Sequence, residues 1–164
     1  MTDIAIRPFR AGDEAAVIAL ILPIQREEFD IAISAADQPD LAEIPAFYQS
    51  GKGQFWVAVR GDAVVGTIGL KDIGNDQAAL RKMFVAAAYR GREHGVATRL
   101  LAGLLDHARA VGLGDIILGT TAKFLAAHRF YEKNGFVEIS AEDLPASFPR
   151  MMVDTKFYRL RLRG

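Results

Sequence analysis

The sequence predicts a single α/β domain: a mixed sheet of about seven strands, covered by about four helices. Apolar stretches of strand and helix length follow one another in the order β-α-α-β-β-β-α-β-α-β-β. A helix expected over Val96–Val111 joins the fourth and fifth strands, and such a connection is a right-handed crossover between parallel strands. The chain has 164 residues, of which 51% are hydrophobic, which is enough for one full core. We therefore expect residues 1–164 to form one domain.

The N-terminal half should supply three strands and two helices. Pro23 should end or bend the first helix, because proline disrupts the helical hydrogen bonds. Alternating apolar residues on both sides of Gly61-Asp62 predict a hairpin. The expected elements of this half are the strand Ile4–Pro8, the helices Glu14–Leu22 and Leu41–Gln49, and the hairpin strands Gln54–Val59 and Val64–Leu70.

The C-terminal half should supply four strands and two long helices. Asp72–Gln77, rich in Gly, Asn and Asp, is the expected turn before the fourth strand. Asn134-Gly135 should end the last helix, since both residues tolerate the left-handed conformation found at helix C-termini. The expected elements are the strand Ala79–Val85, the helix Val96–Val111, the strand Asp115–Leu118, the helix Ala122–Lys133, and the strands Phe136–Ile139 and Met151–Leu162.

The loop between the fourth strand and the next helix contains two arginines and two glycines, namely Arg90, Gly91, Arg92 and Gly95. The first N–H groups of a helix have no partner within the helix, and the helix dipole adds partial positive charge there. Two guanidinium groups beside such N–H groups suit a diphosphate better than a single carboxylate. The loop therefore predicts a phosphate-binding site where the helix begins, near Val96.

Two segments of the chain resemble the GNAT (GCN5-related N-acetyltransferase) superfamily. Arg92-Glu93-His94-Gly95-Val96-Ala97 matches its Gln/Arg-x-x-Gly-x-Gly/Ala signature and follows a strand that ends in Met83-Phe84-Val85. Farther along the chain, Arg129-Phe130-Tyr131-Glu132-Lys133-Asn134-Gly135-Phe136 is similar to the FYEKxGF segment of that family. The resemblance extends over nearly the whole chain. It implies the GNAT fold, with splayed fourth and fifth strands, and N-acetyltransferase activity with acetyl-CoA as the acetyl donor.

The resemblance also implies where acetyl-CoA binds. Main-chain N–H groups of residues 92–97 would hold the pyrophosphate, and the main chain of residues 83–85 would pair with the amides of the pantetheine arm. Arg92 is aligned with the signature arginine, and Arg90 is the alternative. The expected cofactor-binding residues are Met83, Phe84, Val85, Arg90, Arg92, Glu93, His94, Gly95, Val96, Ala97, Thr98, Phe124 and His128.

Three positions depart from the family pattern, and the third removes the usual general base. Glu93 stands where glycine is common, so its carboxylate should point away from the phosphates, and Phe124 replaces an asparagine that often contacts the pantetheine arm. Ala79 stands where many members have a glutamate on the fourth strand. We take Glu28 as the expected base; a chain of water molecules is the alternative, because burial can lower the pKa of the amine itself. The other carboxylates considered are Glu27, Asp72 and Asp76.

Tyr131 is the expected general acid, as the matching tyrosine of the family motif implies. A phenol with a pKa near 10 keeps its proton at neutral pH and can give it to the leaving thiolate. The structural alternative is an aromatic residue that packs against Phe136. Because the chain has no cysteine and no recognisable Ser/His/Asp order, we expect direct attack in a ternary complex without an acyl-enzyme.

Composition excludes several classes of function. The 20 basic and 20 acidic residues cancel, so composition predicts no basic face for nucleic acid. The absence of cysteine excludes disulfides and cysteine–zinc sites and fits a cytoplasmic protein. The three histidines are not paired at metal-ligand spacing, so no metal is expected. No apolar run approaches the ~20 residues of a membrane span, so neither a membrane nor a nucleic acid is an expected partner.

The expected acceptor is the primary amine of a small molecule or amino-acid-like metabolite. Its pocket should be formed by residues 23–48 and 141–150, with Arg150 offering a cation to an acidic group. The chain could act as a monomer or a homodimer. The alternative function is a non-catalytic acyl-CoA-binding or sensing module of the same fold. A nucleotide-binding domain unrelated to CoA is disfavoured, because the chain has no Gly-Lys-Ser/Thr phosphate loop.

Overall fold

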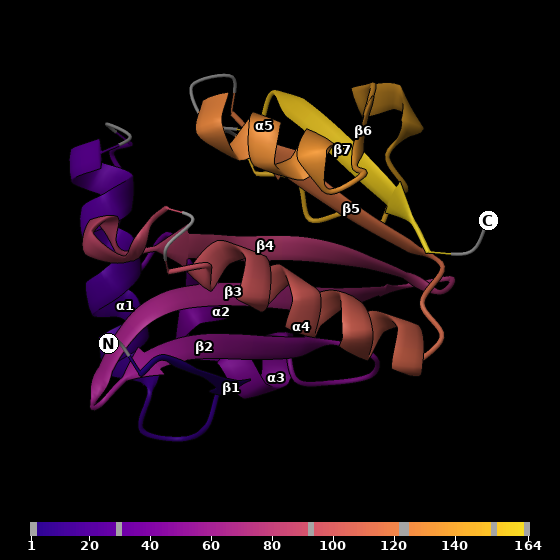
Figure 1. Ribbon diagram of the computed structural model, residues 1–164. Helices are drawn as coiled ribbons and strands as arrows, with labels where there is room; N and C mark the ends of the chain where they lie inside the picture. Colours follow the sequence, from indigo (N-terminus) through magenta and orange to yellow (C-terminus); the bar gives the residue numbers. More distant parts are fainter. Residues whose placement is uncertain (1–2, 29–30, 92–93, 122–124, 152–153, 163–164) are drawn as a thin grey trace.

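The computed structural model describes residues 3–28, 31–91, 94–121, 125–151 and 154–162, and it contains one seven-stranded sheet (Figure 1). The strand order is β1-β2-β3-β4-β5-β7-β6; β4 and β5 are parallel, and the other neighbouring pairs are antiparallel. The predicted mixed sheet with parallel fourth and fifth strands is confirmed. The strands are β1 (Ala5–Pro8), β2 (Gln54–Arg60), β3 (Ala63–Gly74), β4 (Gln77–Val85), β5 (Asp115–Thr120), β6 (Val137–Ile139) and β7 (Lys156–Arg161).

Five α-helices occur among the described residues, one more than the sequence predicted: α1 (Glu14–Pro23), α2 (Pro39–Ala42), α3 (Ile44–Phe47), α4 (Val96–Ala110) and α5 (Leu125–Lys133). The predicted helix Leu41–Gln49 is replaced by the two short helices α2 and α3, which are divided at Glu43. A continuous helix would place Pro45 inside it, where proline has no N–H to donate and its ring clashes with the preceding turn. Short turns of other helix types span Ile24–Glu28 (π), Ala87–Tyr89 and Ala141–Asp143 (3₁₀).

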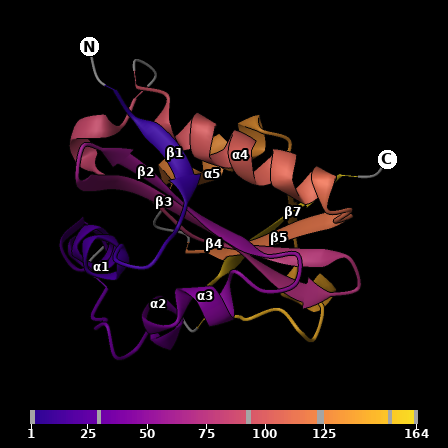
Figure 2. The same ribbon diagram turned by 90° about the horizontal axis from the view of Figure 1, so that it is seen from below.

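Helices cover both faces of the sheet. In Figure 2, α4 and α5 lie on one face, and α1, α2 and α3 lie on the other. The side chains of β2 alternate between these two layers: Trp56 and Ala58 belong to the cluster that contains Leu100 of α4, and Phe55 and Val57 to the cluster under α1. Each face of the sheet therefore has its own buried apolar layer.

Some strand ends differ from those predicted. The turn expected over Asp72–Gln77 is shorter, because β3 continues to Gly74 and only Asn75 and Asp76, both with positive φ, separate it from β4. Such two-residue turns suit the twist of a hairpin and favour asparagine and aspartate. The last strand begins at Lys156 and not at Met151.

β4 and β5 separate after a short parallel pairing. Gln77, Ala78 and Ala79 pair with residues 115–117 of β5, whereas residues 80–85 of β4 have no pairing with β5. Figure 1 shows the two strands diverging from the end where they pair. The predicted splay of these strands is therefore confirmed, and it determines where a ligand could enter the sheet. No helix in the described part of the chain has the length and apolarity that crossing a membrane would require.

Candidate active site

A cavity of about 810 Å³ lies where β4 and β5 diverge. Its walls include β4 from Leu80 to Val85, β5 from Leu118 to Thr120, and Phe130 and Tyr131 of α5. Met83, Phe84 and Val85, which the resemblance assigns to the pantetheine arm, therefore line it. An edge of β4 without a strand partner can pair with an extended ligand, because its main-chain donors and acceptors are spaced for a strand.

The beginning of α4 forms part of the cavity wall. Gly95 is the N-cap residue, with φ +60°, and it lines the cavity together with residues 97–98. Among the described residues, the N–H groups of residues 96–98 have no hydrogen-bond partner. The N–H groups of His94 and Gly95 instead donate to the carbonyl of Gly91, over 3.4 and 3.3 Å. In the described part of the chain, the donors left for a phosphate are those of the first turn of α4. Residues 92 and 93 of the predicted set 92–97 lie outside the described residues.

Gly95 provides a direct test of this geometry. We expect Gly95→Ala to lower the free energy of unfolding by about 1 kcal/mol, because a left-handed conformation is strained for residues with a Cβ. The added methyl group would meet no atom within 4 Å, so the cost is conformational and not steric. Urea unfolding measures it. Gly103→Ala, in the middle of α4 and with equally open space, is the matched control and should raise stability, since alanine is the better helix former. Equal losses in both variants would contradict this account.

Arg90 and the predicted base Glu28 form an ion pair. Arg90 lines the cavity, donates from Nε to the carbonyl of Val85 at 2.8 Å, and places Nη1 2.6 Å from Oε1 of Glu28. Glu28 lies in the π-helical turn after α1 and is not among the residues that line the cavity. The structure therefore pairs Glu28 with a cation of the cavity wall but does not place Glu28 itself in the described part of that wall.

The other carboxylates considered as bases also lie outside the cavity. Asp72 accepts hydrogen bonds from the N–H groups of Lys52 and Gly74, which hold its pKa below the usual range. Asp76 forms an ion pair with Lys52, and Glu27 is exposed on the π-helical turn. None of the three is part of the described cavity wall.

The remaining predicted cofactor residues fall into two groups. Arg92, Glu93 and Phe124 lie outside the described residues. His94, Val96 and His128 are described, but none of them lines the cavity. The ring of His94 packs against Tyr89, and the side chain of Val96 is buried in the core under α4. His128 is buried, with Nε2 2.9 Å from the carbonyl oxygen of Thr121.

Tyr131 both packs in the core and lines the cavity. Its ring centroid is 5.5 Å from that of Phe136, as the structural alternative requires. Its hydroxyl points across to β4 and donates to Sδ of Met83 at 3.7 Å. Burial raises the pKa of the Tyr131 phenol above its ordinary value, so the hydroxyl keeps its proton at neutral pH. Tyr131 can therefore donate a proton within the cavity.

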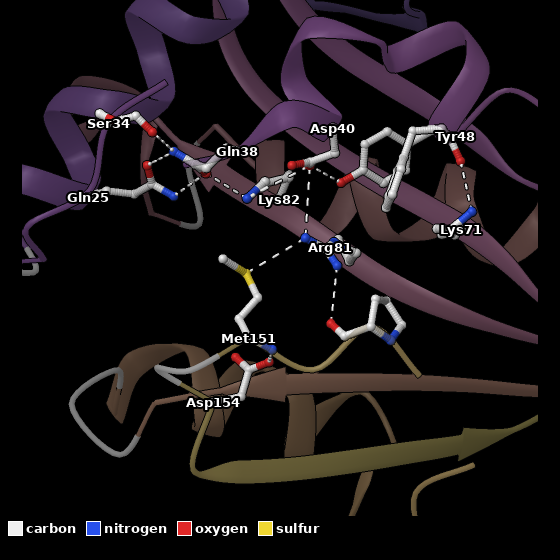
Figure 3. A network of polar contacts seen from close by, with 12 residues as sticks. Gln25, Ser34, Gln38, Asp40, Tyr48, Lys71, Arg81, Lys82, Met151 and Asp154 are labelled. Atoms are coloured by element: carbon white, nitrogen blue, oxygen red, sulfur yellow. Dashed lines mark hydrogen bonds and ion pairs between the residues drawn. The ribbon is translucent and has the colours of Figure 1, made fainter. Parts of the chain in front are cut away.

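A buried polar network that the sequence did not predict lies beside the β4 wall of the cavity (Figure 3). Nη2 of Arg81 and Nζ of Lys82 each lie 3.9 Å from Oδ2 of Asp40. The hydroxyl of Tyr48 donates to the same oxygen at 2.6 Å. Lys82 also donates to Oε1 of Gln38 at 2.6 Å. Two residues of β4 are thus tied to α2 and to Gln38 just before it, on the face of the sheet opposite α4.

Burial changes the ionisation of this network. The side chains of Lys82, Asp40 and Arg81 are only 3%, 6% and 13% exposed. Burial lowers the pKa of Lys82 to about 8, although Asp40 favours the charged form. The ammonium group is therefore charged at neutral pH but loses its proton in mildly alkaline solution. Arg81 and Lys82 both line the cavity, so their charge is available to a ligand.

Asp154 is a buried carboxylate in the same cavity. Its Oδ2 accepts a hydrogen bond from the N–H of Met151 at 2.9 Å. A Cβ at Gly119 would lie 2.7 Å from this oxygen, so Asp154 packs directly on β5 beyond its last pairing with β4. Burial raises the pKa of Asp154. Arg150, which was expected to offer a cation to the acceptor, is not part of the described cavity wall. Its guanidinium lies over the ring of Phe157 instead.

The comparisons with known proteins agree with this fold. Residues 18–136 match the Acetyltransferase (GNAT) family. The chain is 31% identical to the human N-acetylaspartate synthetase over 158 residues, which cover 91% of this chain and 52% of that protein. It therefore spans about half the length of that relative. A GNAT-family acetyltransferase from Staphylococcus aureus has 40% identity and a TM-score of 0.94, covering 98% of this chain and 100% of that one.

A more distant structure shows the same fold. A putative acetyltransferase from Salmonella typhimurium, solved with its cofactor acetyl-CoA, is 21% identical, with a TM-score of 0.72 over 99% of this chain and 96% of that one. The family match covers most of the chain, from the middle of α1 to the residue before β6, and includes the whole β4-α4-β5 crossover. The chain belongs to the GNAT family of acetyltransferases.

Proposed function

We propose that this protein is an N-acetyltransferase that transfers the acetyl group of acetyl-CoA to the primary amine of a small, amino-acid-like acceptor. The observation that carries the proposal is the cavity between the diverging β4 and β5. At the beginning of α4 are N–H groups without a partner among the described residues, and the cavity wall contains a tyrosine hydroxyl. The name of the human relative, an N-acetylaspartate synthetase, supports an amino acid as acceptor. The Salmonella structure of the same fold supports acetyl-CoA as donor.

The residues present suit acetyl-CoA, which would supply an acetyl thioester. The N–H groups of residues 96–98, with Arg99 beside them in the cavity wall, would hold the pyrophosphate. The edge of β4 from Leu80 to Val85 would bind the amides of the pantetheine arm. The mostly apolar wall would keep water from the thioester.

The acetyl transfer requires two proton movements. The nitrogen of the neutral acceptor amine forms the new C–N bond, and the C–S bond breaks. Tyr131 gives its hydroxyl proton to the departing thiolate, while the proton lost from nitrogen returns to the solvent or to the tyrosine. The products are an N-acetylated acceptor and the free thiol of CoA. The cytoplasmic location and the choice between monomer and homodimer stay predictions from the sequence.

Calorimetry with acetyl-CoA and a free-thiol release assay over a panel of primary amines test this proposal together. We expect acetyl-CoA to bind and at least one amine to accelerate thiol release above the rate without amine. Binding without accelerated release for any amine would favour the acyl-CoA-binding module. No binding of acetyl-CoA would overturn both functions.

A further inference from the structure

A β-bulge brings two basic side chains of β4 to the same face of the sheet. Lys82 has φ +55°, and the β3–β4 register shifts there, since Thr67 pairs with Phe84 and Gly69 with Arg81. The hydroxyl of Thr67 donates to the carbonyl of Lys82 at 2.7 Å. In a regular strand, Arg81 and Lys82 would point to opposite faces. Here both approach Asp40, so the bulge creates a pair of cations.

The cations of this pair are not fully neutralised by their neighbour. Arg81 and Lys82 share one carboxylate, Asp40, whose Oδ2 already accepts the short hydrogen bond from Tyr48. Both ion-pair distances are 3.9 Å, longer than hydrogen bonds. Within this group of three, one unit of positive charge is left over, and it faces the carboxylate of Asp154, which interacts electrostatically with both Arg81 and Lys82. A ligand carboxylate placed against Arg81 and Lys82 would pair with these buried cations more closely than Asp40 does at 3.9 Å.

The opposite wall of the cavity carries negative charge. Asp154 packs on Gly119, in the part of β5 that has separated from β4. Figure 3 shows it below Arg81, across from Lys82 and Asp40. The cavity thus presents two cations from the β4 side and one carboxylate from the β5 side.

We propose that the acceptor is an α-amino acid, bound with its carboxylate against Arg81 and Lys82 and its amino group beside Asp154. This inference rests on the acetyl transfer proposed above. Asp154 takes a proton from the ammonium group, which leaves the neutral amine that attacks the thioester carbon. A base with a raised pKa suits this step, because its pKa lies closer to the pH of the reaction.

Steady-state thiol release with matched acceptors tests the carboxylate site. Each amino acid is compared with the amine that lacks its α-carboxylate: leucine with isopentylamine, phenylalanine with phenethylamine, glutamate with γ-aminobutyrate. Lys82→Met should lower kcat/KM for the best amino acid by about 10–10²-fold, the usual effect of losing a hydrogen bond to a charged group, and lower kcat/KM for the matching amine much less. The pKa of Lys82 adds a pH test: the preference for the amino acid should fall as pH rises above about 8.

Lys71→Met is the matched control for charge. Lys71 lies on the neighbouring strand β3 and is not part of the described cavity wall. Its Nζ lies 4.4 Å from the centroid of the Phe47 ring. This variant should keep the wild-type preference. Calorimetry with acetyl-CoA and thermal unfolding show whether a loss of activity in Lys82→Met comes from misfolding. If Lys82→Met misfolds, Lys82→Arg replaces it as the test: this variant keeps the charge and should preserve the preference for the amino acid.

Asp154→Asn tests the other half of the site. Asparagine keeps an oxygen for the N–H of Met151, so the fold should persist while the base is lost. We expect kcat/KM to fall by about 10²-fold and the acidic limb of its pH profile to disappear. A wild-type enzyme that acetylates amines as well as the matching amino acids would overturn the carboxylate site and leave acetyl transfer intact. If no amine or amino acid accelerates thiol release, both proposals fall.

Discussion

We expect Tyr131→Phe to lower kcat by about 10²-fold with little change in the KM for acetyl-CoA. Phenylalanine keeps the packing against Phe136 and removes only the hydroxyl, which donates to Sδ of Met83 across the cavity. A general acid contributes typically 10²–10⁴-fold to rate, and a proton given only to the departing thiolate affects kcat more than binding. Steady-state kinetics with the best acceptor from the amine panel measure both constants.

Tyr158→Phe is the matched control for this variant. The ring centroids of Tyr158 and Tyr131 are 6.1 Å apart. The hydroxyl of Tyr158 donates to Glu132, and Tyr158 is not part of the described cavity wall. Its kcat should stay within about twofold of the wild type, as expected for a group that makes no transition-state contact. If Tyr131→Phe keeps the wild-type kcat, Tyr131 is a packing residue and not the acid.

We expect Asp40→Ala to lower the free energy of unfolding by about 3 kcal/mol. The substitution removes the carboxylate shared by Arg81 and Lys82 and the acceptor of the Tyr48 hydroxyl, all of them largely buried. Removing one member of a buried ion pair typically costs 3–5 kcal/mol, because an uncompensated charge is left behind. Urea unfolding at neutral pH, where Lys82 is charged, measures the loss.

The double variant Asp40→Ala with Lys82→Met separates the loss of charge balance from the loss of packing. Methionine fills much of the volume of the lysine chain and carries no charge, so it removes the uncompensated ammonium. We expect the double variant to be more stable than Asp40→Ala alone, by at least about 1 kcal/mol. If the double variant loses as much unfolding free energy as the two single variants together, the Lys82–Asp40 pairing contributes nothing to stability.

The crossover from β4 through α4 to β5 could be predicted because its signals are local. The apolar strand, the glycine before α4 and the amphipathic helix follow one another between Leu80 and Ala110, so the sequence order is also the spatial order. The splay came from the family resemblance, since no local pattern separates β4 from β5. The single helix predicted over Leu41–Gln49 was wrong because Pro45 interrupts it, and the chain forms α2 and α3 instead.

The acceptor side could not be predicted because its parts are distant in sequence. Asp40 meets Arg81 and Lys82 only after α2 packs over the sheet, and Asp154 reaches the cavity from the segment before β7. One signal was present: two adjacent basic residues inside the apolar strand Leu80–Val85. In a regular strand, one of these two side chains would point into the apolar core under α4. Adjacent basic residues at this place therefore indicate a bulge, and the structure has one at Lys82. The pairing of Glu28 with Arg90 is likewise a contact between residues distant in sequence, which no local pattern indicates.

A crystal structure of the protein with coenzyme A tests the central claim most directly. The account predicts the pantetheine arm between β4 and β5, along residues 80–85, with the pyrophosphate within hydrogen-bond distance of the N–H groups of residues 96–98. Coenzyme A bound elsewhere, or with its phosphates away from the beginning of α4, would contradict it.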